Sequence, residues 1–144
     1  MFNPSRDEVR RFFCEVWRKT ENALPLVGAE LAAADAVRRH PEYHALLADP
    51  EGAQRGEWGP EGGVMNPFLH LSLHLAVAEQ LALDQPSGIR AAFSRLAARM
   101  ERHEAEHRLI ETLAETLWAA QRQGSMLDTA AYLDAIRRLG SVKK

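Results

Sequence analysis

The sequence predicts an all-α fold, a single-domain bundle of five to six helices with one long loop rich in glycine and proline. Apolar residues recur at helical intervals along most of the 144 residues. Residue types that begin and end helices flank these stretches. No stretch argues for a sheet, and a chain of this length buries a sizeable core as one domain, residues 1–144, without disulfides.

The first helix is expected over residues 4–21. Ser5 lies three positions before Glu8, which is the spacing of a capping box. The apolar residues that follow at helical intervals are Val9, Phe12, Phe13 and Val16. Charged residues occupy many of the other positions, so we expect an amphipathic helix with one buried face.

Two further helices are expected over residues 25–39 and 41–48. The first is rich in alanine, a strong helix former. Pro41 disfavours helical geometry at His40, so the chain should kink or restart there. Residues 49–66 are dense in glycine and proline and lose the apolar period, which predicts a long loop.

Residues 67–83 carry signals for both helix and strand. Asn66 and Pro67 form a good helix start, a cap residue followed by proline. Apolar and polar residues then alternate as in a strand, with His70 and His74 among the polar ones. We expect a helix because strong helix formers extend the stretch to about 17 residues, longer than an ordinary strand. Only a helix brings the two imidazoles close, with Cβ atoms about 6 Å apart.

The last part of the chain is expected to form helices over residues 88–123 and 128–139. Ser87 caps the first of them and Gly124 ends it. Such a helix is too long for so small a domain, so we expect a break near residues 100–103. The inward residues of the final helix are expected to be Tyr132, Leu133, Ile136 and Leu139.

All six histidines fall into pairs spaced four residues apart, which places two imidazoles on one face of a helix. The pairs are His40/His44, His70/His74 and His103/His107. Six histidines scattered at random over this chain would give roughly 0.2 such pairs. The pattern therefore predicts a metal site. Pro41 makes the first pair the weakest of the three.

The other two pairs are expected to meet in the fold. Thirteen residues separate His70 from the end of its helix, a rise of about 20 Å. The next helix returns by the same rise if it runs antiparallel. His103 and His107 then lie beside His70 and His74, as in bundle metal sites that are assembled from facing helices.

Four imidazoles suit a divalent transition metal, and zinc, iron, manganese and nickel all fit. Glu111 lies one turn beyond the last histidine and is expected to add a carboxylate oxygen, with His44 as a further ligand. The alternative is that one pair consists of hydrogen-bonded core histidines and the other of solvated ones. The concurrence of pairs favours a metal, because two imidazoles inside an apolar helix each need a partner.

The segment His103-Glu104-Ala105-Glu106-His107 also matches the zinc peptidase signature, in which Glu104 would be the general base. Three features oppose this alternative. Charged residues surround the motif, no third ligand follows at the metzincin spacing, and no sheet edge is expected to align a peptide. Glu104 and His107 instead have the Glu-x-x-His spacing of di-iron bundles, although only one such unit is evident.

Four other side chains carry separate expectations. Cys14 lies beside two phenylalanines and is expected to be a buried thiol. Trp17 and Trp118 are expected to anchor the core. Trp58, in the predicted loop, is expected to pack against the bundle and hold the loop there. The alternative is that it closes over a site or contacts a partner.

Composition argues against several classes of partner. A net charge of −2 with interleaved charges provides no basic stripe for nucleic acid. The longest apolar stretch is short for a membrane span and carries histidines. The N-terminal residues lack the features of a signal peptide, so we expect a cytoplasmic protein. No phosphate-binding loop or dinucleotide fingerprint identifies a small-molecule substrate. As the oligomeric state we expect a homodimer.

Several blocks of the sequence carry a family resemblance. They are MFNPSRDEVRRFF, HPEYHALLADPE, NPFLHLSLHLAVAEQ, DQPSGIR, HEAEHRLIE and LWAAQR. Together they resemble a bacterial family of uncharacterised proteins, the domain of unknown function 1841. The resemblance covers nearly the whole chain and implies a small soluble protein, but it brings no reaction or ligand set. The paired histidines are also similar to those of metal-binding bundles of the hemerythrin and damage-inducible types.

The sequence thus supports two functional hypotheses. The preferred one is a helical bundle that binds one or two divalent metal ions, as a metal-dependent hydrolase or in redox or oxygen handling. The other is a metal-free interaction or self-associating module with core and surface histidines. Metal content and the effect of histidine substitutions separate the two hypotheses.

Overall fold

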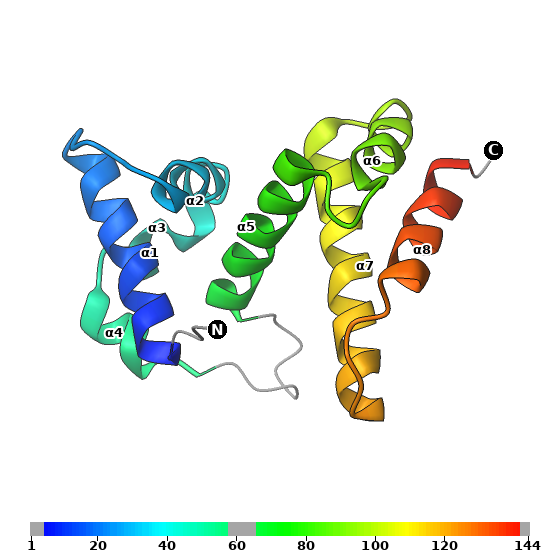
Figure 1. Ribbon diagram of the computed structural model, residues 1–144. Helices are drawn as coiled ribbons and strands as arrows, with labels where there is room; N and C mark the ends of the chain where they lie inside the picture. The colour runs from blue at the N-terminus through cyan, green and yellow to red at the C-terminus, as the bar shows by residue number, and fades with distance from the viewer. Residues whose placement is uncertain (1–4, 58–65, 142–144) are drawn as a thin grey trace. The chain divides into compact units, whose positions relative to one another are not determined.

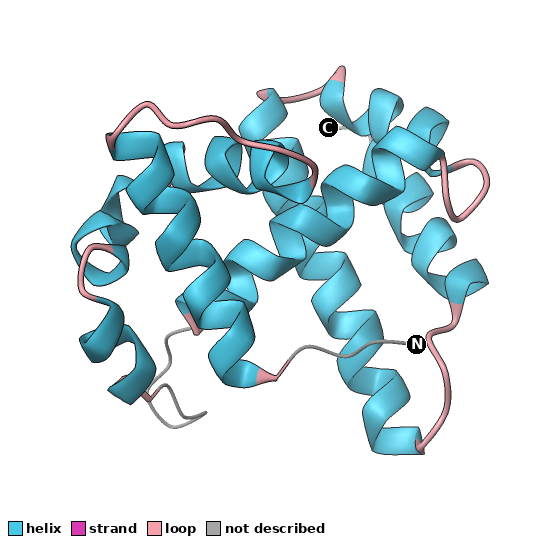
Figure 2. Ribbon diagram, turned by 60° about the vertical axis from the view of Figure 1, so that its left-hand side comes forward, coloured by secondary structure: helices cyan, strands magenta, loops and turns pink. Residues whose placement is uncertain are grey.

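The regular secondary structure of the chain is helical. The computed structural model describes residues 5–57 and 66–141, and within these ranges it contains α-helices and one 3₁₀ helix but no strand (Figure 2). The all-α prediction is therefore confirmed. Eight α-helices are present in the described ranges, more than the five to six expected, because the predicted segment 88–123 divides into two α-helices and an additional short helix forms at Pro50–Arg55.

The helices follow one another along the chain as Figure 1 labels them. They are α1 (Arg6–Glu21), α2 (Ala29–Arg38), the 3₁₀ helix η1 (Pro41–Tyr43), α3 (His44–Leu47), α4 (Pro50–Arg55), α5 (Pro67–Leu83), α6 (Ile89–Ala97), α7 (Arg102–Gln123) and α8 (Thr129–Ser141). The chain separates into two compact units, Met1–Leu75 and Ala76–Lys144. The single domain expected from chain length stays a prediction.

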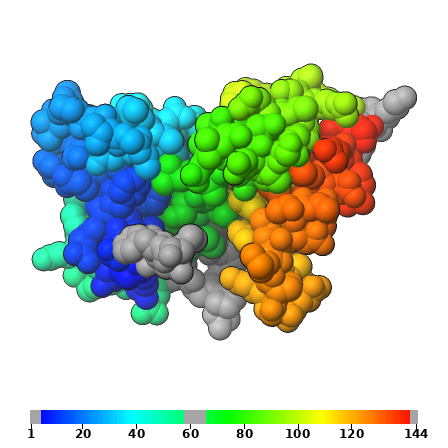
Figure 3. All heavy atoms as spheres, in the orientation of Figure 1, coloured from blue at the N-terminus to red at the C-terminus, as the bar shows by residue number. Residues whose placement is uncertain are grey.

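The start of α1 confirms the predicted capping box. Ser5 Oγ accepts a hydrogen bond from the Glu8 amide (3.2 Å), and Glu8 Oε1 accepts one from the Ser5 amide (2.8 Å). Two otherwise unpaired amides of the first turn are satisfied in this way. The buried face of α1 packs against α2, and the two helices adjoin in the blue part of Figure 3. The fully buried residues of this contact include Phe13 and Val16 of α1 and Ala33, Ala34 and Val37 of α2.

The second helix begins later than predicted. Residues 25–28 are not helical, and the chain enters α2 through Gly28, whose φ of +59° lies outside the helical region. The predicted kink at His40 is confirmed, since its φ of −126° and ψ of 67° are not helical. The predicted segment 41–48 forms η1 followed by α3.

The predicted loop 49–66 is wrong at its beginning, where α4 forms. The Asp49 side chain caps this helix by accepting from the Gly52 amide (3.2 Å), and Pro50 occupies the first turn. These local signals outweigh the missing apolar period. Residues 58–65 of the predicted loop, including Trp58, lie outside the described residues.

A buried arginine holds the end of α4. Arg10 of α1 is only 3% exposed, and its Nη1 donates hydrogen bonds to the carbonyls of Ala53 (2.8 Å), Gly56 (2.8 Å) and Gln54 (3.2 Å). These carbonyls belong to the last turn of a helix, where backbone acceptors lack intrahelical partners and a positive charge is favoured. The guanidinium also lies 5.2 Å from the centre of the Phe68 ring at the start of α5. Arg10 thus joins α1, α4 and α5.

The helix prediction for residues 67–83 is confirmed as α5. Asn66 Oδ1 accepts from the Phe68 amide at 2.8 Å, which caps the first turn. Phe68 and Leu71 are buried in the first unit, while Leu69 is 50% exposed. The strand-like alternation therefore arises from a helix that is apolar on most sides.

The second unit is built from α6, α7, α8 and the end of α5. The break between α6 and α7 occurs at residues 98–101, as expected, and Gly124 ends α7 with a φ of +66°. The most extensive contact joins α6 and α8. At Gly140 a Cβ atom would meet the Leu96 amide nitrogen at 3.3 Å, which explains how the two backbones approach closely. Tyr132 of α8 is fully buried and donates from its hydroxyl to Gln80 Oε1 (2.6 Å).

The expectation that Trp118 anchors the core is wrong. Trp118 is 61% exposed and lies against the guanidinium of Arg122, 4.4 Å from the ring centre. Leu117 beside it is also exposed, whereas Ile110 and Leu113 are buried. The buried face of α7 therefore does not include Leu117, although Ala120 further along is buried again. In the first unit, Trp17 is half-buried and Cys14 is buried, as predicted for the thiol.

Within the described residues, no helix has both the length and the apolar character needed to cross a bilayer.

We predict that Arg10→Met lowers the free energy of unfolding by about 2–3 kcal/mol, because buried carbonyl acceptors lose their donor. Arg11→Met is the matched control, since Arg11 is exposed and its Nε makes only a 3.4 Å contact with the Asp7 carbonyl. The control should change stability by no more than about 0.5 kcal/mol. Urea unfolding measures both. Equal effects of the two substitutions would contradict the role given to Arg10.

Candidate metal centre

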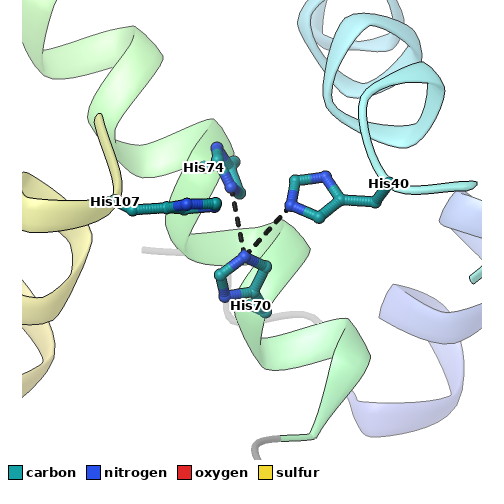
Figure 4. A group of neighbouring side chains, drawn as sticks. All are labelled: His40, His70, His74 and His107. Atoms are coloured by element: carbon teal, nitrogen blue, oxygen red, sulfur yellow. Dashed lines mark hydrogen bonds between the residues drawn. The ribbon is translucent and has the colours of Figure 1, made fainter. Parts of the chain in front are cut away.

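Three histidine side chains of the first unit converge on one point. The ligand nitrogens of His40, His70 and His74 lie within 4.8 Å of one another. His70 Nε2 is 3.2 Å from His40 Nε2 and 3.2 Å from His74 Nε2 (Figure 4). His40 and His74 are buried, with 2% and 5% of their surface exposed, and His70 is half-buried. The structure therefore gathers three imidazoles in a largely dry environment.

Two of these residues are placed by the α5 helix. His70 and His74 stand one turn apart, with ring centres separated by 4.8 Å and ring planes at 77°. This is the consequence of four-residue spacing that the sequence predicts. Buried apolar neighbours on the same helix, Leu71 and Leu73, fix the face that the pair presents.

His40 is placed by the end of α2. Pro41 keeps the backbone of His40 out of helical geometry, and its ring centre lies 4.9 Å from that of His70. His40 Nδ1 lies 2.7 Å from the Ala36 carbonyl oxygen. Because a carbonyl can only accept, Nδ1 must carry the proton and donate it. The other nitrogen, Nε2, then presents its lone pair to His70.

The two contacts at His70 compete for a single proton. His40 Nε2 offers a lone pair, so a bond to it requires a proton on His70 Nε2. A protonated His70 Nε2 has no lone pair left and can only donate. Its one N–H either serves one 3.2 Å contact or is shared, with weaker geometry, between the lone pairs of His40 and His74. A cation that binds all three lone pairs removes this conflict.

The spacing of the nitrogens agrees with metal coordination. Two imidazole nitrogens bound at about 2.0–2.1 Å to one tetrahedral ion lie about 3.3–3.4 Å apart. The observed separations are both 3.2 Å. The Nδ1–H bond from His40 to a backbone carbonyl is also the usual arrangement behind a metal-bound histidine, where it fixes the ring and its tautomer.

Tyr43 of η1 covers one side of this group. Its ring stacks on His40 with the planes at 5° and the centres 5.4 Å apart, and it lies edge-on to His70 at 6.3 Å. Burial raises the pKa of Tyr43, and the neighbouring Glu42 raises it further. The phenol is therefore neutral at physiological pH.

His44, predicted as a further ligand, has a different environment. Its Nε2 donates to the Val37 carbonyl (2.8 Å), and its ring stacks on Trp17 with centres 3.9 Å apart. Among the described residues, His44 is not part of the group that could hold an ion, whereas His40 is. The sequence pattern favours His44 over His40 as a ligand, because Pro41 interrupts the helix at His40. No local signal shows that the non-helical His40 directs its ring toward α5.

The remaining predicted site residues lie on α7, in the second unit. His103 and His107 are half-buried, with ring centres 4.3 Å apart and planes at 72°. His107 is also drawn in Figure 4. Glu104 and Glu111 are exposed, whereas Glu106 is buried and pairs with Arg102 at 3.3 Å. Roles for His103, Glu104 and Glu111 at a metal stay predictions.

We predict that His40 in the metal-free protein is the Nδ1–H tautomer, because Nδ1 donates to the Ala36 carbonyl. Long-range ¹H–¹⁵N correlation spectra of the imidazole nitrogens distinguish the two tautomers. His44 provides an internal reference with the opposite assignment, since its Nε2 donates to Val37. An Nε2–H tautomer at His40 would show that this nitrogen is not directed to the group as a lone pair.

Comparison with known proteins gives a family without an assigned activity. No curated protein and no solved structure matches this sequence. The sequence profile of one family, described as a domain of unknown function, matches residues 5–138. That span covers most of the chain and contains all six histidines. The resemblance noted from the sequence blocks is therefore confirmed, and the chain belongs to the family DUF1841.

Proposed function

We propose that this protein binds a divalent transition-metal ion through Nε2 of His40, His70 and His74. The observation that supports it most is the pair of 3.2 Å contacts between imidazole nitrogens, which a single N–H cannot fully satisfy. The burial of His40 and His74 and the backbone carbonyl behind His40 add to it.

We propose His107 as a fourth ligand. The proposal rests on the sequence, which predicts that the second histidine pair returns to the level of the first, and on the four ligands of a tetrahedral ion. His103 and Glu111 flank His107 at four-residue spacing and are the alternatives for this position.

The donor set favours some of the predicted metals over others. Imidazole nitrogen suits zinc, iron and nickel, whereas manganese prefers carboxylate and water oxygens. No aspartate or glutamate of the described residues joins the group. We therefore propose zinc, iron or nickel, in a protein that acts in hydrolysis or in redox or oxygen handling.

We predict that protein purified without a histidine tag binds about one equivalent of zinc, and that His40→Ala, His70→Ala and His74→Ala each lower the affinity by at least ~100-fold. The expected loss exceeds that for a supporting residue because each variant removes a ligand. Isothermal titration calorimetry and elemental analysis provide the measurements.

His44→Ala is the matched control, a half-buried histidine of the same unit whose Nε2 is held by a carbonyl. It should keep the zinc affinity within about threefold, although it loses a neutral hydrogen bond worth about 1 kcal/mol of stability. The proposal fails if the wild-type protein binds less than about a tenth of an equivalent after addition of zinc, iron or nickel.

We predict a smaller loss for His107→Ala, on the order of tenfold, because three imidazoles remain to hold the ion. The same titrations on His103→Ala and Glu111→Ala show which residue of α7 supplies the fourth ligand. Unchanged affinity in all three variants would confine the site to the first unit.

A further inference from the structure

The ligands that converge in the first unit carry no negative charge. An imidazole binds a metal through a neutral nitrogen lone pair. Within the part of the chain that the structure describes, the group consists of histidines alone, without a carboxylate or a thiolate. A divalent ion held there keeps its full charge of about +2, in contrast to ions bound by aspartate, glutamate or cysteine.

Among the described residues, three acids on the elements that carry the histidines do not join the group. Asp35 of α2 is 65% exposed at its side chain and pairs with Arg39 at 3.2 Å. Glu42 of η1 and Glu79 of α5 are both exposed to solvent. Because exposed charges are screened by water and salt, these carboxylates compensate little of a charge held in a buried site.

The group behind His40 is neutral as well. His40 Nδ1 donates to the backbone carbonyl of Ala36, not to a carboxylate of the kind that often supports a metal-bound histidine. The carbonyl oxygen orients the ring without adding a negative charge. At His40 this hydrogen bond thus fixes the ligand but does not balance the charge of the ion.

An unbalanced charge is costly in these surroundings. His40 and His74 are almost fully buried, and Leu71 and Leu73 are buried beside them on α5. A charge in such a place requires a partner of opposite sign or direct ligands that neutralise it. The three imidazoles also leave at least one coordination position open on a tetrahedral ion.

We infer that the metal centre binds an exogenous oxyanion directly at this open position, the carboxylate or phosphate group of a small molecule. The inference rests on the proposed metal site and on a histidine rather than Glu111 as any fourth ligand. It holds for four histidine ligands too, because an ion bound by His107 as well still lacks a negative ligand and can take the anion as a fifth. The oxyanion supplies the charge that the protein does not.

The test uses the full chain loaded with Co²⁺, whose visible absorption reports the ligands of the ion. Free cobalt is removed by dialysis, and the protein is titrated with sodium acetate and, in a separate arm, with inorganic phosphate. Sodium chloride at equal ionic strength is the control. We expect a saturable change of the absorption bands with a dissociation constant on the order of 1 mM for at least one oxyanion. The anion with the lower constant identifies the class of group that the site prefers.

Three results separate the possible failures. If no cobalt is retained by the wild-type protein or by His44→Ala, the proposed metal site itself is wrong. If one equivalent is retained but neither anion changes the spectrum, the metal site stands and the oxyanion inference is overturned. The inference is also overturned if chloride produces the same change at the same concentration, since the response is then not specific to oxygen anions.

Discussion

The hydrogen bond from His40 Nδ1 to the Ala36 carbonyl determines the chemistry of the histidine group. A neutral imidazole has one protonated nitrogen, so fixing the proton on Nδ1 also fixes the lone pair on Nε2. That lone pair is what meets His70, and the sterics of Pro41 bring the ring to this position. The backbone conformation of His40, its tautomer and the direction of its lone pair are thus all set locally, at the end of α2.

The apolar surroundings of the histidine group favour close packing of the imidazoles but disfavour a charge among them. Buried apolar residues and stacked rings hold the imidazoles close together, with Tyr43 on the face of His40 and Leu71 between the two histidines of α5 in the sequence. The same apolar surroundings make any uncompensated charge expensive. If the proposed metal ion binds there, the imidazole donors would select among metals, and the charge of the ion would select among further ligands.

The sequence predicts helices well where the signals are local. The capping box at Ser5, the cap at Asn66 and the left-handed Gly124 each depend on residues within one turn, and each is present in the structure. The His70/His74 proximity is predictable for the same reason. Helix length, rather than periodicity, identifies α5 correctly.

The features that escaped prediction depend on contacts distant in sequence. His40 meets α5 across 30 residues, so its spacing to His44 gives no indication of its partner. The α4 helix is stabilised in part by Arg10, far away on α1. The exposure of Trp118 shows that an aromatic residue on a helix face is not necessarily inward when a guanidinium can cover its ring.

The hydrogen bonds from Arg10 to the end of α4 also bear on the kinetics of the proposed metal site. Its bond to Ala53 joins residues 43 positions apart, and the closed loop contains α2, η1 and α3 together with His40. Because closing a loop of this length costs conformational entropy, we expect the contact to form late in folding, and a late contact slows unfolding more than it speeds folding. We therefore expect it to slow local unfolding of the segment that carries His40. The residence time of a bound ion would then depend on an arginine that does not contact it.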